Sequence, residues 1–208
     1  IQTPFGVVLS SFLACFLYSM GISSWVLTPV TEPAFMIGIT ANIAMVAAGT
    51  ATPETLNLVT DPTIYSAYMW IGGIGRTFPL VIMLAISKSA KLKALVRACL
   101  VPAVFNINEP VVFGCVAWNP IMMIPMWLTS IVLPLVIWVF TKVIPFAPIP
   151  TIVFDMWYCP FPICTWLTTQ SIKGILLMIL CAVIGTVIWY PFFKTYEKQE
   201  IQNEQTKG

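Results

Sequence analysis

Long apolar stretches alternate with short polar ones along this chain. Four of the apolar stretches are long enough to cross a bilayer: residues 4–20, 64–87, 122–140 and 172–193. A helix needs about 20 apolar residues to span the hydrocarbon core, whereas strands of a membrane barrel alternate over about ten residues. The pattern therefore predicts an all-α integral membrane protein that crosses the bilayer several times.

Two further apolar stretches are interrupted too often for a continuous helix. Residues 30–48 are bracketed and interrupted by proline, glycine and asparagine, and residues 144–162 contain five prolines. Proline removes a backbone donor and disturbs a helix, and broken backbone inside a membrane is tolerated where protein or a water-filled cavity satisfies it. We therefore expect broken or re-entrant helical hairpins, as in a polytopic transport domain.

A cluster of glycines, Gly72-Gly73-Ile74-Gly75, lies in the middle of the predicted crossing 64–87. Glycines let helices approach closely, which favours a continuous packed helix. The alternative is an unwound glycine turn that lines a pathway. The sequence leaves both interpretations open, and close helix packing is the preferred one.

The composition excludes several functional classes. Only 9% of the 208 residues are charged and the mean hydropathy is +0.91, against about 25% charged residues in a typical soluble domain. The basic residues are too few and too scattered for nucleic-acid binding. The chain has no histidine, which excludes histidine-based metal sites and catalytic triads, and we expect neither a metal nor another cofactor. The six cysteines form no CxxC pair and are interpreted as small packing residues.

Charge along the chain predicts the topology. Residues 88–97 contain four basic residues and no acid, which is typical of a cytoplasmic loop. Residues 51–62 carry Glu54 and Asp61 and are expected to form an aqueous loop on the outer side. We predict that residues 1–193 form a membrane-embedded transport domain and residues 194–208 a polar cytoplasmic tail. The chain begins with isoleucine rather than methionine, which we interpret as a fragment of a longer polypeptide.

Glu109 is the most informative residue of the sequence. It lies in the otherwise hydrophobic stretch 98–121, beside two asparagines and Pro110. An ionised carboxylate at bilayer depth costs about 2.5–3.5 kcal/mol, and such residues usually face a cavity or a partner. Because the proline also disfavours a helical backbone before it, the stretch predicts a polar binding site near the bilayer midplane.

The same stretch carries a family resemblance. The run Phe105-Asn106-Ile107-Asn108-Glu109-Pro110-Val111-Val112-Phe113-Gly114, with Ile71-Gly72-Gly73 before it and Asn119-Pro120 after it, resembles one family of membrane proteins. This family is the membrane subunit (enzyme IIC) of the lactose/cellobiose/diacetylchitobiose branch of the bacterial phosphoenolpyruvate-dependent sugar phosphotransferase system. Family members are considerably longer. The resemblance thus implies a C-terminal, substrate-binding half, without the N-terminal helices that make most of the homodimer interface.

The resemblance implies a multi-pass sugar permease of the bacterial plasma membrane. It would bind a β-linked disaccharide and offer its 6-hydroxyl to a phosphocysteine of the cytosolic IIB subunit, which depends in turn on IIA. The phosphoryl donor thus lies on a partner, and whether this chain itself counts as an enzyme stays open. The carboxylate matching Glu109 holds the sugar and helps to take the hydroxyl proton. In the alternative interpretation, Glu109 only caps a hairpin by accepting backbone N–H bonds.

Other positions are implied as substrate contacts. Asn106 and Asn108 offer the donors and acceptors that a polyol requires, and we expect at least one of them to contact the sugar. Trp157 matches a family tryptophan that lies against the sugar ring, where a flat aromatic surface suits weakly apolar C–H faces. Tyr18 stands where family members commonly have another tryptophan.

Two positions depart from the family pattern. Where the family has Gly-Ile-His-Gly, with its histidine at the substrate, this chain has Gly21-Ile22-Ser23-Ser24. Ser23 can hydrogen-bond a hydroxyl but cannot act as a base near neutral pH. Arg76 stands where a small or polar residue is expected, and it should have an anionic partner such as Glu32, Glu109 or a group of the substrate.

Two alternatives to the sugar permease remain open. An ion-coupled secondary transporter would also use broken helices and an intramembrane acid. A sensor, or a remnant of the family that has lost transport, is compatible with the missing histidine. Both differ from the first interpretation in whether the protein binds and moves a sugar.

Overall fold

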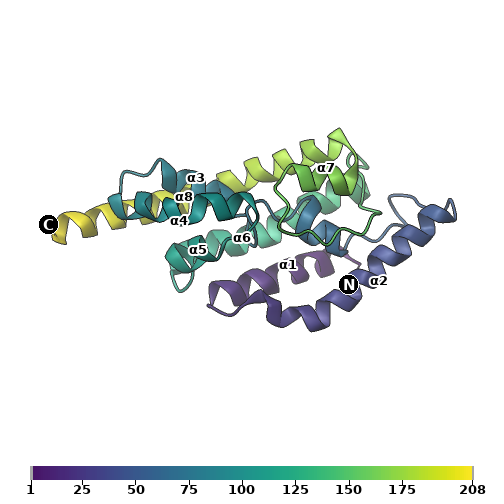
Figure 1. Cartoon of the computed structure of the whole chain (residues 1–208), viewed down its shortest axis with the longest axis horizontal. Coiled ribbons are helices and arrows are strands. Elements are labelled where there is room, and N and C mark those ends of the chain that lie inside the picture. Colours follow the sequence, from purple (N-terminus) through teal and green to yellow (C-terminus); the bar gives the residue numbers. More distant parts are fainter. Residues whose placement is uncertain (1, 208) are drawn as a thin grey trace.

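The computed structural model describes residues 2–207, which form helices and loops with no strand among them. Four long helices make the frame (Figure 1): α1 (Pro4–Ser19), α2 (Thr28–Ala47), α6 (Pro120–Trp138) and α8 (Ile172–Lys207). Three helical segments of the described chain are long and apolar enough to cross a membrane: Ser24–Ala47, Pro120–Val143 and Ile172–Thr206. The predicted all-α membrane fold is confirmed.

The core lies where α6 packs between α1 and α8. Pro125 and Pro134 lie inside α6 without ending it, because neighbouring helices and local adjustments satisfy the freed backbone groups. A short π-helical segment, η4 (Val139–Val143), continues α6 to the end of its crossing. These helices form a continuous support against which the broken elements pack.

The stretch 64–87 is not the single continuous helix that the sequence favoured. It consists of η2 (Pro62–Ala67), a glycine turn, and α3 (Phe78–Ala85). Gly72, Gly73 and Gly75 have φ of +78°, +85° and +78°, and Arg76 has φ of +54°. Left-handed backbone of this kind ends a helix and favours glycine. The alternative interpretation, an unwound glycine turn, is therefore the one found.

The Glu109 element is a re-entrant hairpin, as expected. Helix α4 (Ala90–Val104) runs inward, the chain reverses at residues 105–108, and α5 (Glu109–Val111) with η3 (Val112–Val116) runs back beside it (Figure 1). The two arms pack closely at Gly114, where a Cβ atom would lie 2.6 Å from a methyl carbon of Leu95. At the tip of the hairpin, Asn106 and Asn108 are buried and Glu109 is exposed.

Two other expectations are corrected. Helix α2 is continuous, so residues 30–48 are not a broken element: Pro29 and Pro33 fall in its first two turns, where few backbone bonds are lost. Asn42 does not interrupt the helix but fixes it, because its Nδ2 donates to the carbonyls of Asn57 (2.8 Å) and Pro150 (3.1 Å). Asp61 is not part of an aqueous loop, since only 8% of it is exposed.

The remaining elements are short. A turn of 3₁₀ helix, η1 (Ser24–Leu27), joins α1 to α2, and α7 (Ile163–Thr169) precedes α8. The proline-rich residues 144–162 contain no regular helix, as predicted. Helix α7 packs against η2, where the Thr165 hydroxyl donates to the carbonyl of Ala67 at 2.8 Å.

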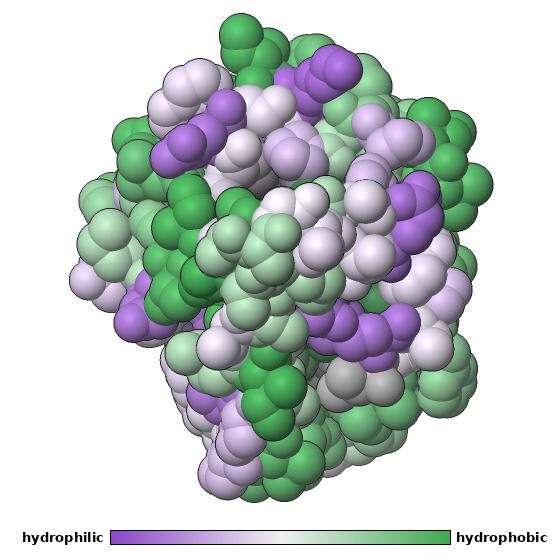
Figure 2. All heavy atoms as spheres, turned by 90° about the vertical axis from the view of Figure 1, so that its right-hand side faces the viewer, coloured by the Kyte–Doolittle hydropathy of each residue, from purple (hydrophilic) through white to green (hydrophobic). Residues whose placement is uncertain are grey.

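Helix α8 extends through the predicted boundary at residues 193/194 and reaches the end of the described chain (Figure 1). Its last turns contact the loop before α4: the Glu204 carboxylate accepts bonds from the Ser89 hydroxyl (2.6 Å) and the backbone of Lys91 (2.9 Å). The basic residues 88–97, most of which belong to the start of α4, therefore lie at the same end as the last turns of α8. The loop after α2 lies at the opposite end, where hydrophilic residues are spread among hydrophobic ones (Figure 2).

Candidate substrate-binding site

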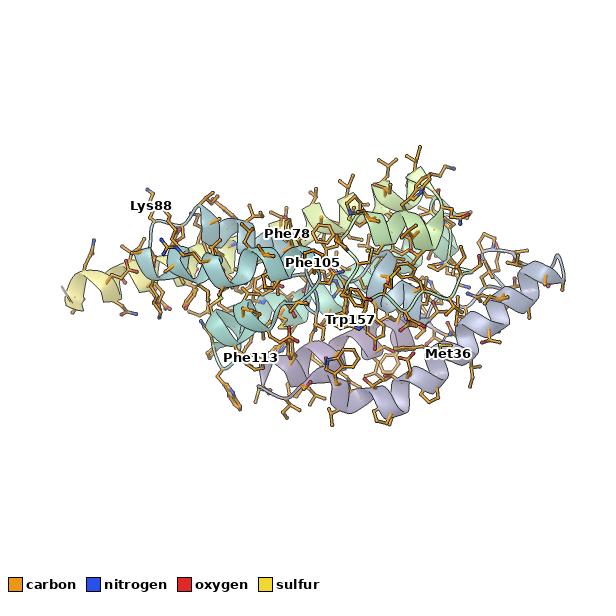
Figure 3. All side chains as sticks on the ribbon, viewed as in Figure 1. Met36, Phe78, Lys88, Phe105, Phe113 and Trp157 are labelled. Atoms are coloured by element: carbon orange, nitrogen blue, oxygen red, sulfur yellow. The ribbon has the colours of Figure 1, made fainter. Side chains whose placement is uncertain are left out.

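Residues far apart in the sequence meet at one pocket with an empty volume of about 310 Å³. The walls come from the end of α1, the start of η1, the glycine turn, the tip of the Glu109 hairpin and the proline-rich loop. All six residues predicted as substrate contacts line it: Tyr18, Ser23, Asn106, Asn108, Glu109 and Trp157. Figure 3 shows Phe105, at the hairpin tip, and Trp157 between Lys88 and Met36 along the long axis of the molecule. That depth agrees with a site inside the membrane.

Asn106 connects three of these segments. Its backbone is left-handed (φ +60°), a conformation that asparagine tolerates, and only 2% of the residue is exposed. Its Oδ1 accepts from the backbone N–H of Gly72 at 3.0 Å, and its Nδ2 donates to the carbonyls of Trp157 and Cys159, both at 3.1 Å. Both amide donors are thus used within the protein, so Asn106 positions the site.

Asn108 fixes the glycine turn against the hairpin tip. Its Nδ2 donates to the Ile74 carbonyl at 2.6 Å and to the Thr77 hydroxyl at 3.1 Å. A Cβ atom on Gly73 would lie 2.6 Å from the Asn106 carbonyl oxygen, so this close approach requires glycine. The side-chain oxygen of Asn108 has no protein donor among the described bonds, which leaves it available to a ligand hydroxyl.

Glu109 begins α5 and is exposed at the pocket. No hydrogen bond or ion pair to its carboxylate is found among the described residues, so it does not serve here as a hairpin cap. The carboxylate lies beside the hydroxyl of Tyr18, a residue only 4% exposed, but that hydroxyl makes no well-formed hydrogen bond within the described residues. A buried hydroxyl without a partner is costly, and a ligand hydroxyl between these two groups would satisfy both.

Aromatic rings form another wall. Trp157 meets Trp25 and Trp70 edge-on, with ring centroids 5.7 and 6.3 Å apart. Trp25 and Trp70, which the sequence did not single out, also line the pocket. Their signal is their position, since Trp25 follows the Ser23-Ser24 pair and Trp70 comes just before the glycine turn. Such a wall offers apolar area to a sugar face, while the polar residues above supply hydrogen bonds.

Ser23 lies at the pocket mouth and is exposed. It precedes η1 as its N-cap, and its hydroxyl accepts a long bond of 3.4 Å from the backbone of Trp25. Ser23, which stands where the resemblance expects a histidine, therefore lines the pocket and is exposed.

The carboxylate partner expected for Arg76 is not found. Both ion pairs of the described residues join other groups, Lys91 to Glu200 and Lys194 to Glu197. The Arg76 guanidinium instead donates from Nη1 to the Ser11 hydroxyl (3.3 Å) and the Thr129 carbonyl (3.4 Å). It lines a second pocket, next to the first.

The glycine turn is held from behind by residues that the sequence did not single out. Trp189 on α8 is fully buried and donates from Nε1 to the carbonyl of Gly75 at 3.2 Å, and the Thr77 hydroxyl donates to the carbonyl of Gly72 at 2.6 Å. Left-handed turns expose such carbonyls, which must find donors inside a membrane. These bonds make the turn a fixed wall of the site.

A polar and aromatic pocket, enclosed by a re-entrant hairpin and a broken crossing inside an apolar helical frame, defines a membrane transport domain. Residues 1–130 match the family model described as "Phosphotransferase system, EIIC". The chain therefore belongs to the EIIC family of the phosphotransferase system.

Several known proteins are similar to it. The oligo-beta-mannoside-specific EIIC component of Bacillus subtilis is 30% identical over 171 residues, which cover 81% of this chain and 38% of that protein. The cellobiose-specific EIIC component of Geobacillus stearothermophilus is 30% identical over 204 residues, covering 97% and 45%. The chain spans less than half the length of these relatives.

One solved structure is also similar. The transporter ChbC, the IIC component of an N,N'-diacetylchitobiose-specific phosphotransferase system, superposes with a TM-score of 0.87 at 27% identity. The match covers 98% of this chain and 47% of that one. The arrangement of broken helices seen here is thus shared with a known EIIC transporter.

Proposed function

We propose that this chain is the sugar-binding part of a phosphotransferase-system permease that takes up a β-linked disaccharide. The permease would lie in the bacterial plasma membrane and cross it several times. It would present the 6-hydroxyl of the bound sugar to the phosphocysteine of a IIB partner, which receives its phosphoryl group from IIA. Residues beyond this chain would complete the dimer. The names of similar proteins, among them cellobiose- and oligo-beta-mannoside-specific components, support a β-linked sugar.

One observation carries the proposal: a carboxylate without an ion-pair partner among the described residues, the buried hydroxyl beside it and an aromatic wall converge on one pocket. Glu109 and Tyr18 lie side by side, and Trp157 forms the wall with Trp25 and Trp70. Sugar binding needs this combination, because hydroxyls require hydrogen-bond partners and the C–H faces require flat apolar area. Glu109 would accept a hydrogen bond from the reacting 6-hydroxyl and take its proton as phosphate is transferred.

Calorimetry with cellobiose, lactose and diacetylchitobiose on the purified full-length protein tests this proposal. Glu109→Gln keeps the shape but removes the charge, and we expect it to weaken binding by about 1.5–3 kcal/mol, a tenfold or greater rise in Kd. Glu54→Gln is the matched control. Glu54 is exposed in the loop after α2, away from the pocket, so this variant should bind the sugars as the wild type does. If the wild-type protein binds no β-linked disaccharide, neutral or acidic, the proposal is wrong, and an ion-coupled transporter or a sensor becomes the better hypothesis.

A further inference from the structure

Arg76 is a buried guanidinium at the end of the glycine turn. Only 2% of the residue is exposed, and its backbone is left-handed (φ +54°). The adjacent turn fixes this backbone, because Trp189 and Thr129 both donate to the carbonyl of Gly75. Ser11 and the Thr129 carbonyl hold one end of the guanidinium, Nη1. The side chain is therefore positioned from several elements.

The other edge of this guanidinium has no partner. Nε and Nη2 are buried and make no hydrogen bond within the described residues. These two nitrogens form the side of the planar group on which two N–H bonds point in parallel. That edge matches the two oxygens of a carboxylate. A buried cation without a counter-charge is strongly unfavourable. A carboxylate that accepts from both nitrogens would therefore stabilise the buried guanidinium.

Arg76 lines a pocket with an empty volume of about 550 Å³. Hydroxyl groups of Ser10, Ser11, Thr28 and Thr31 belong to residues of the same walls. This pocket shares four residues with the substrate pocket, namely Ser24, Trp25, Trp70 and Ile74. The two spaces therefore adjoin along the aromatic wall, with Glu109 lining one and Arg76 lining the other.

The surroundings of Arg76 restrict where an anion is favourable. Glu32 and Asp61 lie near Tyr65, which is part of the same pocket wall. A negative group near Tyr65 would be repelled, whereas one beside Arg76 would be attracted. The position of the charge on the ligand should therefore matter as much as its presence.

From this geometry we infer that Arg76 forms a subsite for the carboxylate of an acidic β-linked disaccharide. The inference rests on the proposed function and names its substrate class. The neutral sugar unit lies at Glu109 and offers its 6-hydroxyl, while the carboxylate-bearing unit extends along the aromatic wall to Arg76. The carboxylate accepts two parallel hydrogen bonds, from Nε and Nη2.

The test compares acids with neutral sugars of the same skeleton. Cellobionic and lactobionic acids keep the non-reducing 6-hydroxyl and carry a carboxylate at the other end. Cellobiitol and lactitol are their neutral open-chain counterparts. On the purified full-length protein, we expect at least one acid to bind tenfold or more tightly than its alditol in calorimetry. Arg76→Gln should abolish this preference, whereas Arg97→Gln, which removes the exposed arginine of α4, should keep it.

Several outcomes would overturn the inference. Acids that bind no better than their alditols, or a preference that survives in Arg76→Gln, exclude the subsite. Binding of neutral cellobiose or lactose in that case leaves the proposed function standing. A protein that binds neither neutral nor acidic disaccharides refutes both. Should Arg76→Gln fail to fold, Arg76→Lys keeps a charge without the paired N–H edge and is expected to lose most of the preference.

Discussion

Asn106 and Gly72 are joined by a hydrogen bond of 3.0 Å between the Asn106 side-chain oxygen and the Gly72 backbone N–H. This bond connects the tip of the re-entrant hairpin to the unwound part of the broken crossing. The same amide donates to two carbonyls of the proline-rich loop that carries Trp157. One buried side chain thus assembles the three irregular segments around the pocket.

We therefore predict that Asn106→Asp weakens the site as a whole. Aspartate keeps the shape and the acceptor for Gly72, but it cannot donate to the carbonyls of Trp157 and Cys159. A buried polar group left without its partner costs about 1–3 kcal/mol. The expected result is a lower unfolding temperature, a changed tryptophan fluorescence spectrum and loss of disaccharide binding. Asn119→Asp, which alters an amide at the start of α6 outside the pocket, is the control and should retain sugar binding. If Asn106→Asp leaves the melting temperature and the sugar affinity unchanged, Asn106 does not hold these three segments together.

Helix α8 should stabilise the loop before α4. Ser89 is fully buried and is the N-cap of α4: its hydroxyl accepts from the backbone of Leu92 at 3.2 Å and donates to Glu204. Loss of an N-cap serine costs about 1 kcal/mol, so Ser89→Ala should lower the melting temperature of the protein in detergent. Glu204→Gln should act in the same direction, because the charged acceptor favours the helix N-terminus.

Thr195→Ala provides the comparison for this prediction. Thr195 is exposed on the same helix, and its hydroxyl bonds only to the carbonyl of Pro191. Its removal should leave the melting temperature nearly unchanged. Equal melting temperatures for Ser89→Ala and Thr195→Ala would show that the C-terminal turns do not support the α4 loop.

Some features of the fold could be predicted from the sequence, and others could not be predicted. The hairpin at Glu109 was predictable, because a charge and a proline inside an apolar stretch leave few structural solutions. The glycine turn was not, since glycines serve close helix packing and unwound backbone equally well. The choice depends on distant donors and acceptors, Asn106 and Trp189. Likewise, the prolines of α2 disturb it little because they fall near its start.

The site was predictable in part for a similar reason. Residues in the Asn-x-Asn-Glu-Pro stretch stand out chemically, and both asparagines and the glutamate line the pocket. Trp25 and Trp70 do not stand out in a chain with eight tryptophans. Tryptophan is a common residue of membrane proteins, especially where helices meet the membrane surface. Only the three-dimensional arrangement, with both rings beside Trp157, separates them from packing residues.

The topology predicts different accessibility at the two ends of the molecule. Ala90, at the start of α4, and Thr55, in the loop after α2, are both exposed and lie at opposite ends (Figure 1). In a background with the six native cysteines replaced, Thr55→Cys should react with a membrane-impermeant thiol reagent in intact cells. Ala90→Cys should react only after the cells are opened, because the basic residues 88–97 are expected to face the cytoplasm. Labelling of position 90 from outside would reverse the orientation.

Ser23 provides the last prediction, because a serine replaces a histidine that the family resemblance places at the substrate. Its side chain is exposed and lines the pocket, and within the described residues its hydroxyl accepts one long hydrogen bond, from the backbone N–H of Trp25. Histidine there would add volume and a second hydrogen-bonding nitrogen. A well-made neutral hydrogen bond contributes about 0.5–1.5 kcal/mol, up to about tenfold in affinity.

We predict that Ser23→His raises the affinity for cellobiose or diacetylchitobiose several-fold, as measured by calorimetry, while the melting temperature stays the same. Ser23→Ala removes the hydroxyl without adding a donor and should bind no better than the wild type, which separates the effect of the imidazole from that of losing serine. Unchanged binding of both sugars by well-folded Ser23→His would mean that this pocket is adapted to a different ligand. A carboxylate-bearing disaccharide held by Arg76 would then be the first candidate, because its affinity would depend on the guanidinium rather than on the residue at position 23.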